Sequence, residues 1–250
     1  MRFFIYFSYN GTKYHGWQIQ PNAITVQQIL EKSISVILNK KIKLVGAGRT
    51  DTGVHAKMMT AHFDSEININ NKKKIIYLLN SYLNSDISII DLKSVTDKAH
   101  ARFDAISRTY EYHISSLKDP FNKEFTYYFR ESLDMDLMNK ASGILLKYSN
   151  FKSFTKSNTD LKNFDCKIIK AKWSTEKNGF IFTIIANRFL RNMVRAIVGT
   201  LLNVGLKKIT LKDFSRIIES KKRSNASYSV PAKGLFLAEI DYPKFLFKND

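Results

Sequence analysis

The sequence holds a single cysteine, Cys166, among its 250 residues. One thiol excludes a disulfide framework and a cysteine-rich metal site. No run of 18 apolar residues occurs, which excludes a membrane-spanning helix. The apolar start from Met1 to Phe7 lacks the small-residue cleavage site of a signal peptide and predicts a strand. These absences predict a cytoplasmic protein without a membrane segment.

Acidic residues are also scarce, with 22 Asp and Glu against 40 Lys and Arg, which gives a formal net charge of +18. Such an excess opposes compaction unless it serves solubility or an anionic partner. The partner indicated by charge alone is a nucleic acid or an acidic membrane surface. With 44% hydrophobic residues, the chain is nonetheless globular.

Proline and glycine are too few to form a linker between the halves of the chain, and the five histidines include no His-x-x-x-His pair. The order of elements predicts an α+β fold of two similar lobes, 1–104 and 105–250, with a mostly antiparallel sheet and a cleft. The expected strands are 2–9, 41–47, 54–64, 87–95, 107–115, 166–174, 180–186 and 235–242. The expected helices are 26–38, 75–83, 136–147, 189–204 and one that begins after Thr210.

The densest chemistry lies in the block Gly48-Arg49-Thr50-Asp51-Thr52-Gly53-Val54-His55-Ala56. Bracketing glycines allow a sharp turn and close approach of a ligand to the backbone. A carboxylate that leaves such a loop beside a guanidinium suits a nucleophile, a base or an ion-pair partner. The alternative is a surface turn in which Asp51 and its neighbouring threonines bond local amides.

Three further segments carry candidate residues. Gln18 lies in a loop rich in aromatic and amide side chains, which can stack on bases and bond their edges. Tyr110 lies on an alternating strand, where a tyrosine offers a flat face and a weak acid, although strand tyrosines usually pack in the core. Arg191 and Arg195 are four residues apart, so a helix over 189–204 would place both on one face. That face is either solvated or directed at a carboxylate.

These segments, in this order, resemble the tRNA pseudouridine synthase A family over nearly the whole chain. The blocks that carry the resemblance are Tyr9-Asn10-Gly11, Gly16-Trp17-Gln18-Ile19-Gln20, Thr25-Val26-Gln27, the Asp51 block, Ala101-Arg102-Phe103, Arg108-Thr109-Tyr110, Phe189 to Arg195, Val198-Gly199-Thr200 and Pro231 to Leu235. Asn10 stands where the family commonly has Asp, and Asn192 where it commonly has His.

The resemblance implies two ferredoxin-like halves around a continuous sheet, with a basic cleft at their junction. It also implies a homodimer that grips one tRNA and isomerises uridines 38 to 40 of the anticodon stem-loop. By the same resemblance Asp51 is essential, Tyr110 stacks on the target base, Arg195 pairs with Asp51, and Arg49 holds the flipped nucleotide. Gln18, His55 and Arg191 complete the predicted RNA contacts.

The chemistry of this isomerisation fits the residues. The N1–C1′ bond of uridine breaks and C5 bonds to C1′ without net oxidation or group transfer, so we expect no cofactor and no metal. Asp51 would attack C1′ or C6, or remove the C2′ proton, and the sequence leaves these three routes open. The base must first be flipped from its helix.

Two other functions compete with this interpretation. Asp51-Thr52-Gly53 is also the signature of aspartic proteases, but no second Asp-Thr-Gly exists in the chain, and an adjacent arginine disturbs two carboxylates that share a proton. A non-catalytic RNA-binding module would need the basic surface but not Asp, Tyr and Arg on three separate segments.

Overall fold

The structure, a computed structural model, describes residues 1–66, 69–157 and 161–248. The chain divides into two compact units, of which unit 1 comprises Met1–Ser107 together with Leu237–Asp250, and unit 2 comprises Arg108–Phe236. The sequence predicted halves at 1–104 and 105–250. The compact units differ from these halves in that the segment from Leu237 belongs to unit 1, and the predicted halves stay a prediction.

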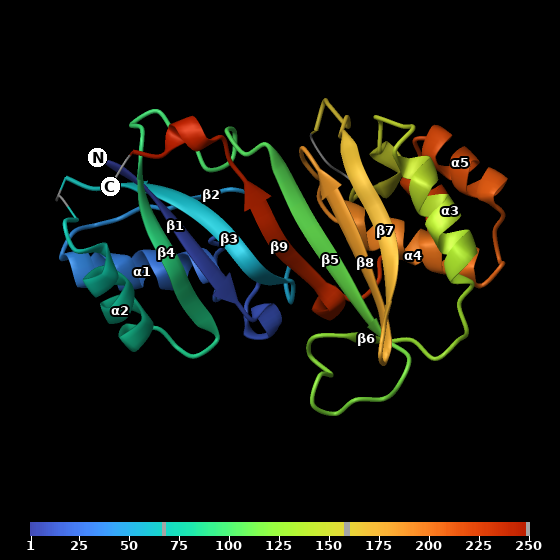
Figure 1. Cartoon of the computed structure of the whole chain (residues 1–250), viewed down its shortest axis with the longest axis horizontal. Helices are drawn as coiled ribbons and strands as arrows, with labels where there is room; N and C mark the ends of the chain where they lie inside the picture. Colours follow the sequence, from blue (N-terminus) through green and yellow to red (C-terminus); the bar gives the residue numbers. More distant parts are fainter. Residues whose placement is uncertain (67–68, 158–160, 249–250) are drawn as a thin grey trace. The chain divides into compact units, whose positions relative to one another are not determined.

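Unit 1 contains strands in the order β4-β1-β3-β9, with the short β2 on β3 (Figure 1). Their bounds are β1 Arg2–Tyr9, β2 Val45–Gly46, β3 His55–Asp64, β4 Ile87–Val95 and β9 Leu235–Asp241. Both β3 and β4 run antiparallel to β1. The predicted strand at 41–47 shortens to two residues, since only Val45 and Gly46 pair with β3.

Two helices complete unit 1, α1 at Val26–Leu38 and α2 at Lys72–Tyr82. They pack on each other, and α2 packs on β4 (Figure 1). The predicted bounds of α1 are confirmed, with the Thr25 side chain accepting the first-turn N–H of Gln28. Helix α2 begins earlier than the predicted 75, because the side chain of Asn71 caps it by accepting from the Lys74 N–H.

Unit 2 contains strands in the order β5-β8-β7, with β6 on β5. Their bounds are β5 Ser107–Ser115, β6 Tyr127–Tyr128, β7 Ile168–Glu176 and β8 Gly179–Ala186. The Asn178-Gly179 hairpin predicted from the sequence joins β7 to β8, which pair antiparallel. The rings of Trp173 and Phe182 meet across this pair with centroids 5.0 Å apart, and both side chains are buried.

Three helices belong to unit 2: α3 at Met135–Leu145, α4 at Met193–Gly205 and α5 at Leu211–Glu219. Helix α3 packs on β7, α4 and α5 (Figure 1). The capping box predicted at Thr210 is present, with Asp213 as its partner. Almost every residue of α4 is buried, so α4 is the central helix of this unit.

The predicted α+β class is confirmed, since each unit consists of strands with helices packed on them. Among the described residues, no helix is both long and apolar enough to cross a membrane. The basic cleft expected between the halves stays a prediction.

Candidate active site

The Asp51 loop connects β2 to β3 in unit 1 and is held by backbone bonds to the segment that follows β1. The N–H of Trp17 donates to the carbonyl of Thr50 at 3.2 Å, and the N–H of Gly53 donates to the carbonyl of Tyr14 at 3.4 Å. Inside the loop, Val54 N–H donates to the Asp51 carbonyl at 3.1 Å. Asp51 itself is half-buried. The backbone on both sides of the carboxylate is therefore fixed.

Gly16 allows this contact between the two segments. Its φ of +83° lies in the left-handed region, and a Cβ at this position would collide with the carbonyl oxygen of Thr50. Glycine avoids both penalties because it has no Cβ. The Gly16-Trp17 pair in the sequence is thus part of the support of the Asp51 loop.

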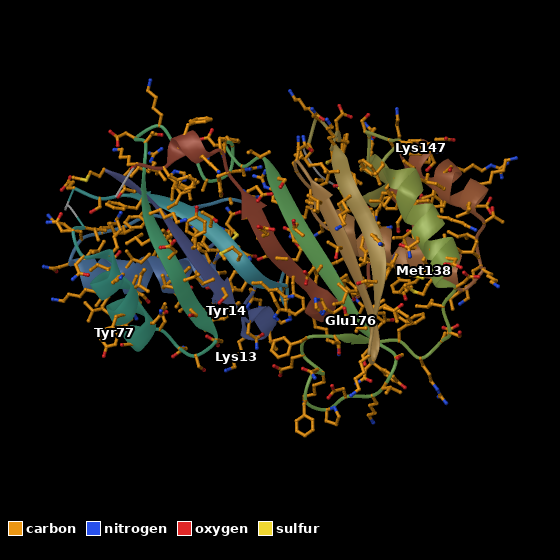
Figure 2. The ribbon with its side chains drawn as sticks, viewed as in Figure 1. Lys13, Tyr14, Tyr77, Met138, Lys147 and Glu176 are labelled. Carbon is orange, nitrogen blue, oxygen red and sulfur yellow. The ribbon has the colours of Figure 1, made fainter. Side chains whose placement is uncertain are left out.

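Side chains extend the support below the loop. Thr50 is buried, and its hydroxyl lies 2.8 Å from the hydroxyl of Tyr9. The ring of Trp17 stacks on Phe7 with centroids 5.4 Å apart. Tyr14, which follows Lys13 after β1 (Figure 2), donates from its hydroxyl to Asp86 at 2.6 Å. Burial raises the pKa of Tyr14 above its usual value, and the bond to Asp86 raises it further.

His55 lies inside unit 1, with 1% of its surface exposed. Its Nδ1 accepts the N–H of Gly11 at 3.1 Å, which ties the first residue of β3 to the segment after β1. The sequence predicted an RNA contact here. Burial favours a structural role for His55 over direct contact with a ligand.

Arg49 and Gln18 are both exposed. Arg49 lies two residues before Asp51, and Gln18 follows Trp17, whose N–H holds the Asp51 loop. The two side chains therefore start from backbone that is joined to the loop. Their exposure is compatible with the predicted contacts to a nucleotide.

Tyr110 lies in the middle of β5 in unit 2, opposite Ile184 of β8. It is half-buried, and its ring packs edge to face on Phe189, with centroids 5.0 Å apart and an interplanar angle of 82°. Such an edge-to-face pair stabilises the position of the Tyr110 ring. The structure thus gives Tyr110 a packed position on β5, and its stacking on a base stays a prediction.

Arg195 lies in the first turn of α4 and is half-buried. Its Nε donates to the carbonyl of Val230 at 2.7 Å, and the Val230 N–H donates back to the Arg195 carbonyl at 3.3 Å. These bonds fix the guanidinium against the segment that leads to β9. The orientation of Arg195 is therefore set by the fold of unit 2.

Arg191 does not share a helix face with Arg195, contrary to the sequence prediction. Helix α4 begins at Met193, and Asn192 before it has the left-handed φ of 68°. The Asn192 side chain donates to Ser229 Oγ at 2.6 Å. Arg191 is exposed in the turn that precedes the helix. The apolar periodicity of 189–204 continued through this turn and concealed it.

Tyr112 was missed as a supporting residue of this region. Its side chain is completely buried, and its hydroxyl donates to the Pro231 carbonyl at 2.8 Å, next to the carbonyl that Arg195 binds. Burial raises the pKa of Tyr112, while the positive charge of Arg195 acts in the opposite direction. The available signal was its position two residues after Tyr110, on the same face of β5.

The candidate residues divide between the units. Asp51, Arg49, Gln18 and His55 belong to unit 1, whereas Tyr110, Arg191 and Arg195 belong to unit 2. Within the described ranges, no three His, Cys, Asp or Glu side chains gather in a way that could hold a metal ion. The pairing of Asp51 with Arg195 stays a prediction.

The sequence model of a family described as tRNA pseudouridine synthase matches residues 5–104 and 148–243, which include Asp51 and Arg195 but not Tyr110. The chain is 50% identical over 248 residues to tRNA pseudouridine synthase A of Azobacteroides pseudotrichonymphae, with 99% of both chains covered. It is 49% identical over 248 residues to the protein of that name from Bacteroides fragilis, with 99% of this chain and 98% of the relative covered. The protein of that name from Clostridium acetobutylicum is 39% identical over 236 residues, with 94% and 96% covered.

Proposed function

Since this chain belongs to the tRNA pseudouridine synthase family, we propose that it isomerises uridine to pseudouridine in tRNA and that Asp51 is the catalytic carboxylate. The observation that carries the proposal is the support of the Asp51 loop, in which Trp17 and Gly53 hold the backbone on either side of Asp51. A fixed loop that leaves its carboxylate half-exposed suits a reaction at a ligand, because a preorganised group needs no reorganisation when it reacts.

The reaction breaks the N1–C1′ bond, turns the uracil and forms a C5–C1′ bond. The proton on C5 leaves, and N1 gains a proton, so atoms and electrons balance without an oxidant. Asp51 starts this sequence by attack on C1′ or C6, or by removal of the C2′ proton. All three routes require an ionised carboxylate.

Arg195 and Tyr110 assist this step. The Arg195 guanidinium, held on the Val230 carbonyl, pairs with Asp51 and keeps it ionised in a site that the base desolvates. Tyr110 stacks on the uracil and retains it after the N1–C1′ bond breaks. Its hydroxyl is also a candidate acceptor of the C5 proton.

Exposed basic residues bind the RNA backbone. Arg49 holds the flipped nucleotide, and Gln18 and Arg191 provide further contacts. The formal net charge of +18 supports phosphate binding, which offsets the cost of flipping a base out of its helix. We further propose that the substrate uridines are positions 38 to 40, and that the protein works as a cytoplasmic homodimer.

The experiment is to incubate purified protein with tRNA transcripts and no added cofactor, and to map pseudouridine. We expect product in the anticodon stem-loop and the same rate with EDTA when spermidine maintains the tRNA fold. Tight tRNA binding without product would instead identify a non-catalytic RNA-binding module. Light scattering after size exclusion tests the homodimer, because a monomer that is fully active would contradict it.

A further inference from the structure

Phe103 is an exposed aromatic side chain in a turn whose Ala101 is fully buried. Its exposed fraction is 73%, whereas Ala99 and Ala101 in the same segment are 1% and 0% exposed. The turn over residues 100–104 lies between β4 and β5 in unit 1, and the proposed function assigns it no role. A large apolar ring gains nothing from water contact. Single exposed aromatic rings are common on protein surfaces, so the exposure of Phe103 is informative only together with the bonds that fix its turn.

The turn is closed by bonds among its own residues. The His100 N–H donates to the Asp104 carboxylate at 2.7 Å, and the Asp104 N–H donates to the His100 carbonyl at 3.0 Å. Nδ1 of His100 accepts the N–H groups of Arg102 at 3.1 Å and Phe103 at 3.3 Å. The backbone of Phe103 is thus bonded directly to the His100 ring.

Neighbouring strands fix the same turn from outside. Nδ1 of His62 on β3 accepts the Ala101 N–H at 3.1 Å, and the Tyr242 hydroxyl, which follows β9, donates to the Ala101 carbonyl at 2.6 Å. The rings of His62 and His100 lie edge to face at 4.6 Å. One residue of β3 and one that follows β9 therefore hold Ala101, while Phe103 is exposed to solvent.

The ring of Phe103 is also flanked by groups of the turn. Its centroid lies 4.3 Å from that of His100, and the Arg102 guanidinium carbon lies 5.6 Å from it. A rigid aromatic with an adjacent cation is the arrangement on which proteins stack unpaired nucleobases. Rigid presentation lowers the entropy lost on binding.

The turn is anchored far along β3 from the Asp51 loop. That loop enters β3 at His55, and Ala101 is bonded to His62. Seven residues of strand separate these two points by about 23 Å. A base bound at Phe103 is therefore not supported by the groups that hold Asp51.

We propose that Phe103, with Arg102 beside it, stacks an unpaired base of the tRNA other than the uridine that reacts at Asp51. This rests on the proposed function, since it takes tRNA as the partner. The positive charge of Arg102 and of the whole chain favours an anionic partner, and an aromatic ring beside that cation favours a nucleobase over an acidic protein surface. This contact contributes to substrate binding and takes no part in proton transfer or in the breaking and forming of bonds.

The test measures binding of full-length tRNA transcript by fluorescence anisotropy to Phe103→Ala, Phe103→Leu and Phe103→Trp. We expect Phe103→Ala and Phe103→Leu to weaken binding about tenfold, as loss of one stacked base does, and Phe103→Trp to bind as wild type. Phe245→Ala is the matched control, because Phe245 is 77% exposed in the same unit. It should bind as wild type. Wild-type binding by Phe103→Leu would overturn the proposal, since leucine cannot stack.

A second readout uses the indole introduced by Phe103→Trp. Trp17 and Trp173 are 3% and 2% exposed, so RNA-dependent quenching of fluorescence reports mainly on position 103. We expect quenching with tRNA in Phe103→Trp and none in Phe245→Trp. Quenching without RNA that grows with protein concentration would overturn the proposal in favour of contact with a second copy of the chain.

The two proposals fail separately. If the wild type forms pseudouridine but Phe103→Ala binds tRNA normally, only the stacking contact is refuted. If the wild type forms no pseudouridine but Phe103→Trp is quenched by tRNA, only the proposed activity is refuted. Circular dichroism and thermal melting of each variant must match the wild type. The Phe103→Trp experiment measures a signal that appears on binding, so a folding defect cannot imitate the expected result.

Discussion

Arg195 and Val230 bind each other twice, through the 2.7 Å bond from Arg195 Nε to the Val230 carbonyl and the 3.3 Å bond from the Val230 N–H to the Arg195 carbonyl. The first bond uses Nε. The proposed pairing with Asp51 therefore relies on the terminal nitrogens of the guanidinium, which form the planar fork that carboxylates accept.

Arg195→Lys should lower kcat about 10- to 100-fold, because an ammonium cannot bond the Val230 carbonyl and form a fork on a carboxylate in one geometry. Lysine keeps the positive charge but binds a carboxylate through a single point charge, so it stabilises the ionised carboxylate less than the guanidinium fork does. Raising the pH should therefore partly restore the rate of Arg195→Lys. The measurement is the pH profile of single-turnover pseudouridine formation.

Arg191→Lys is the matched control for Arg195→Lys, since Arg191 is exposed in the turn before α4. It should weaken tRNA binding modestly, in a way that depends on salt, and leave the pH profile unchanged. If both variants lost tRNA affinity equally, and only in a way that depends on salt, Arg195 would be only a phosphate contact.

Gly16→Ala should damage the Asp51 loop, whereas Gly48→Ala should not. Alanine at position 16 would have to keep a backbone φ of +83°, and its Cβ would collide with the carbonyl oxygen of Thr50. A Cβ at Gly48 meets nothing within 4 Å. We expect Gly16→Ala to cost about 1–3 kcal/mol of unfolding free energy and most of the activity. Urea unfolding and a product assay on both variants check this, and equal behaviour of the two would contradict it.

Tyr110→Phe and Tyr110→Ala separate the ring from the hydroxyl. If stacking is the main role of Tyr110, the Tyr110→Phe variant keeps most of the activity. The Tyr110→Ala variant then loses roughly 1–3 kcal/mol of transition-state stabilisation. If the hydroxyl moves the C5 proton, Phe slows product formation while tRNA binding persists. Single-turnover rates and tRNA affinities of both variants decide between these roles. Wild-type behaviour of both variants would leave Tyr110 as a packing residue on Phe189.

His62 should make unit 1 less stable in mild acid. Burial above all, and then the charges of Arg2 and His100, lower the pKa of His62 from 6.5 to about 4. Between these values the unfolded chain takes up a proton that the folded chain does not, so the unfolding free energy falls as pH falls from 6.5 to about 4. Above pH 6.5 His62 is neutral in both the folded and the unfolded chain, so its full contribution to the unfolding free energy is present.

His62→Asn tests this pH dependence, because its amide oxygen replaces the Nδ1 acceptor of the Ala101 N–H without titrating. Urea unfolding at pH 7 and pH 4.5 should show a smaller loss in His62→Asn than in the wild type. His15→Asn, at an exposed histidine of the same unit, should keep the wild-type loss. An unchanged loss in His62→Asn would assign the acid sensitivity to other groups.

Local signals predicted much of the fold. The strand at Arg2–Tyr9 has the bounds expected from the apolar start of the chain, and the helix at Val26–Leu38 has those expected from its apolar face and the Thr25 cap. The start of α4 was wrong because Asn192 breaks the helix through a bond to Ser229, a residue 37 positions away. Apolar periodicity carries no information about such a contact.

The sequence also did not predict which distant segments lie side by side in the fold. The position of β9 beside β3 is such a long-range pairing, which no local pattern encodes. In the candidate site, composition and motif identified the residues around Asp51, but not the burial of His55 or the support that Tyr112 gives to Pro231. Burial and partners follow from the tertiary fold.

Asp51→Asn separates catalysis from tRNA binding. Tritium release from 5-tritiated uridine in tRNA should disappear in Asp51→Asn, while tRNA affinity stays within a few-fold of the wild type, because the amide keeps the shape of the side chain but is neither a base nor an effective nucleophile. Asp91→Asn, which removes a carboxylate beside Lys93 on β4 of the same unit, should release tritium at the wild-type rate. Release by Asp51→Asn near the wild-type rate would contradict the account and remove Asp51 from the mechanism.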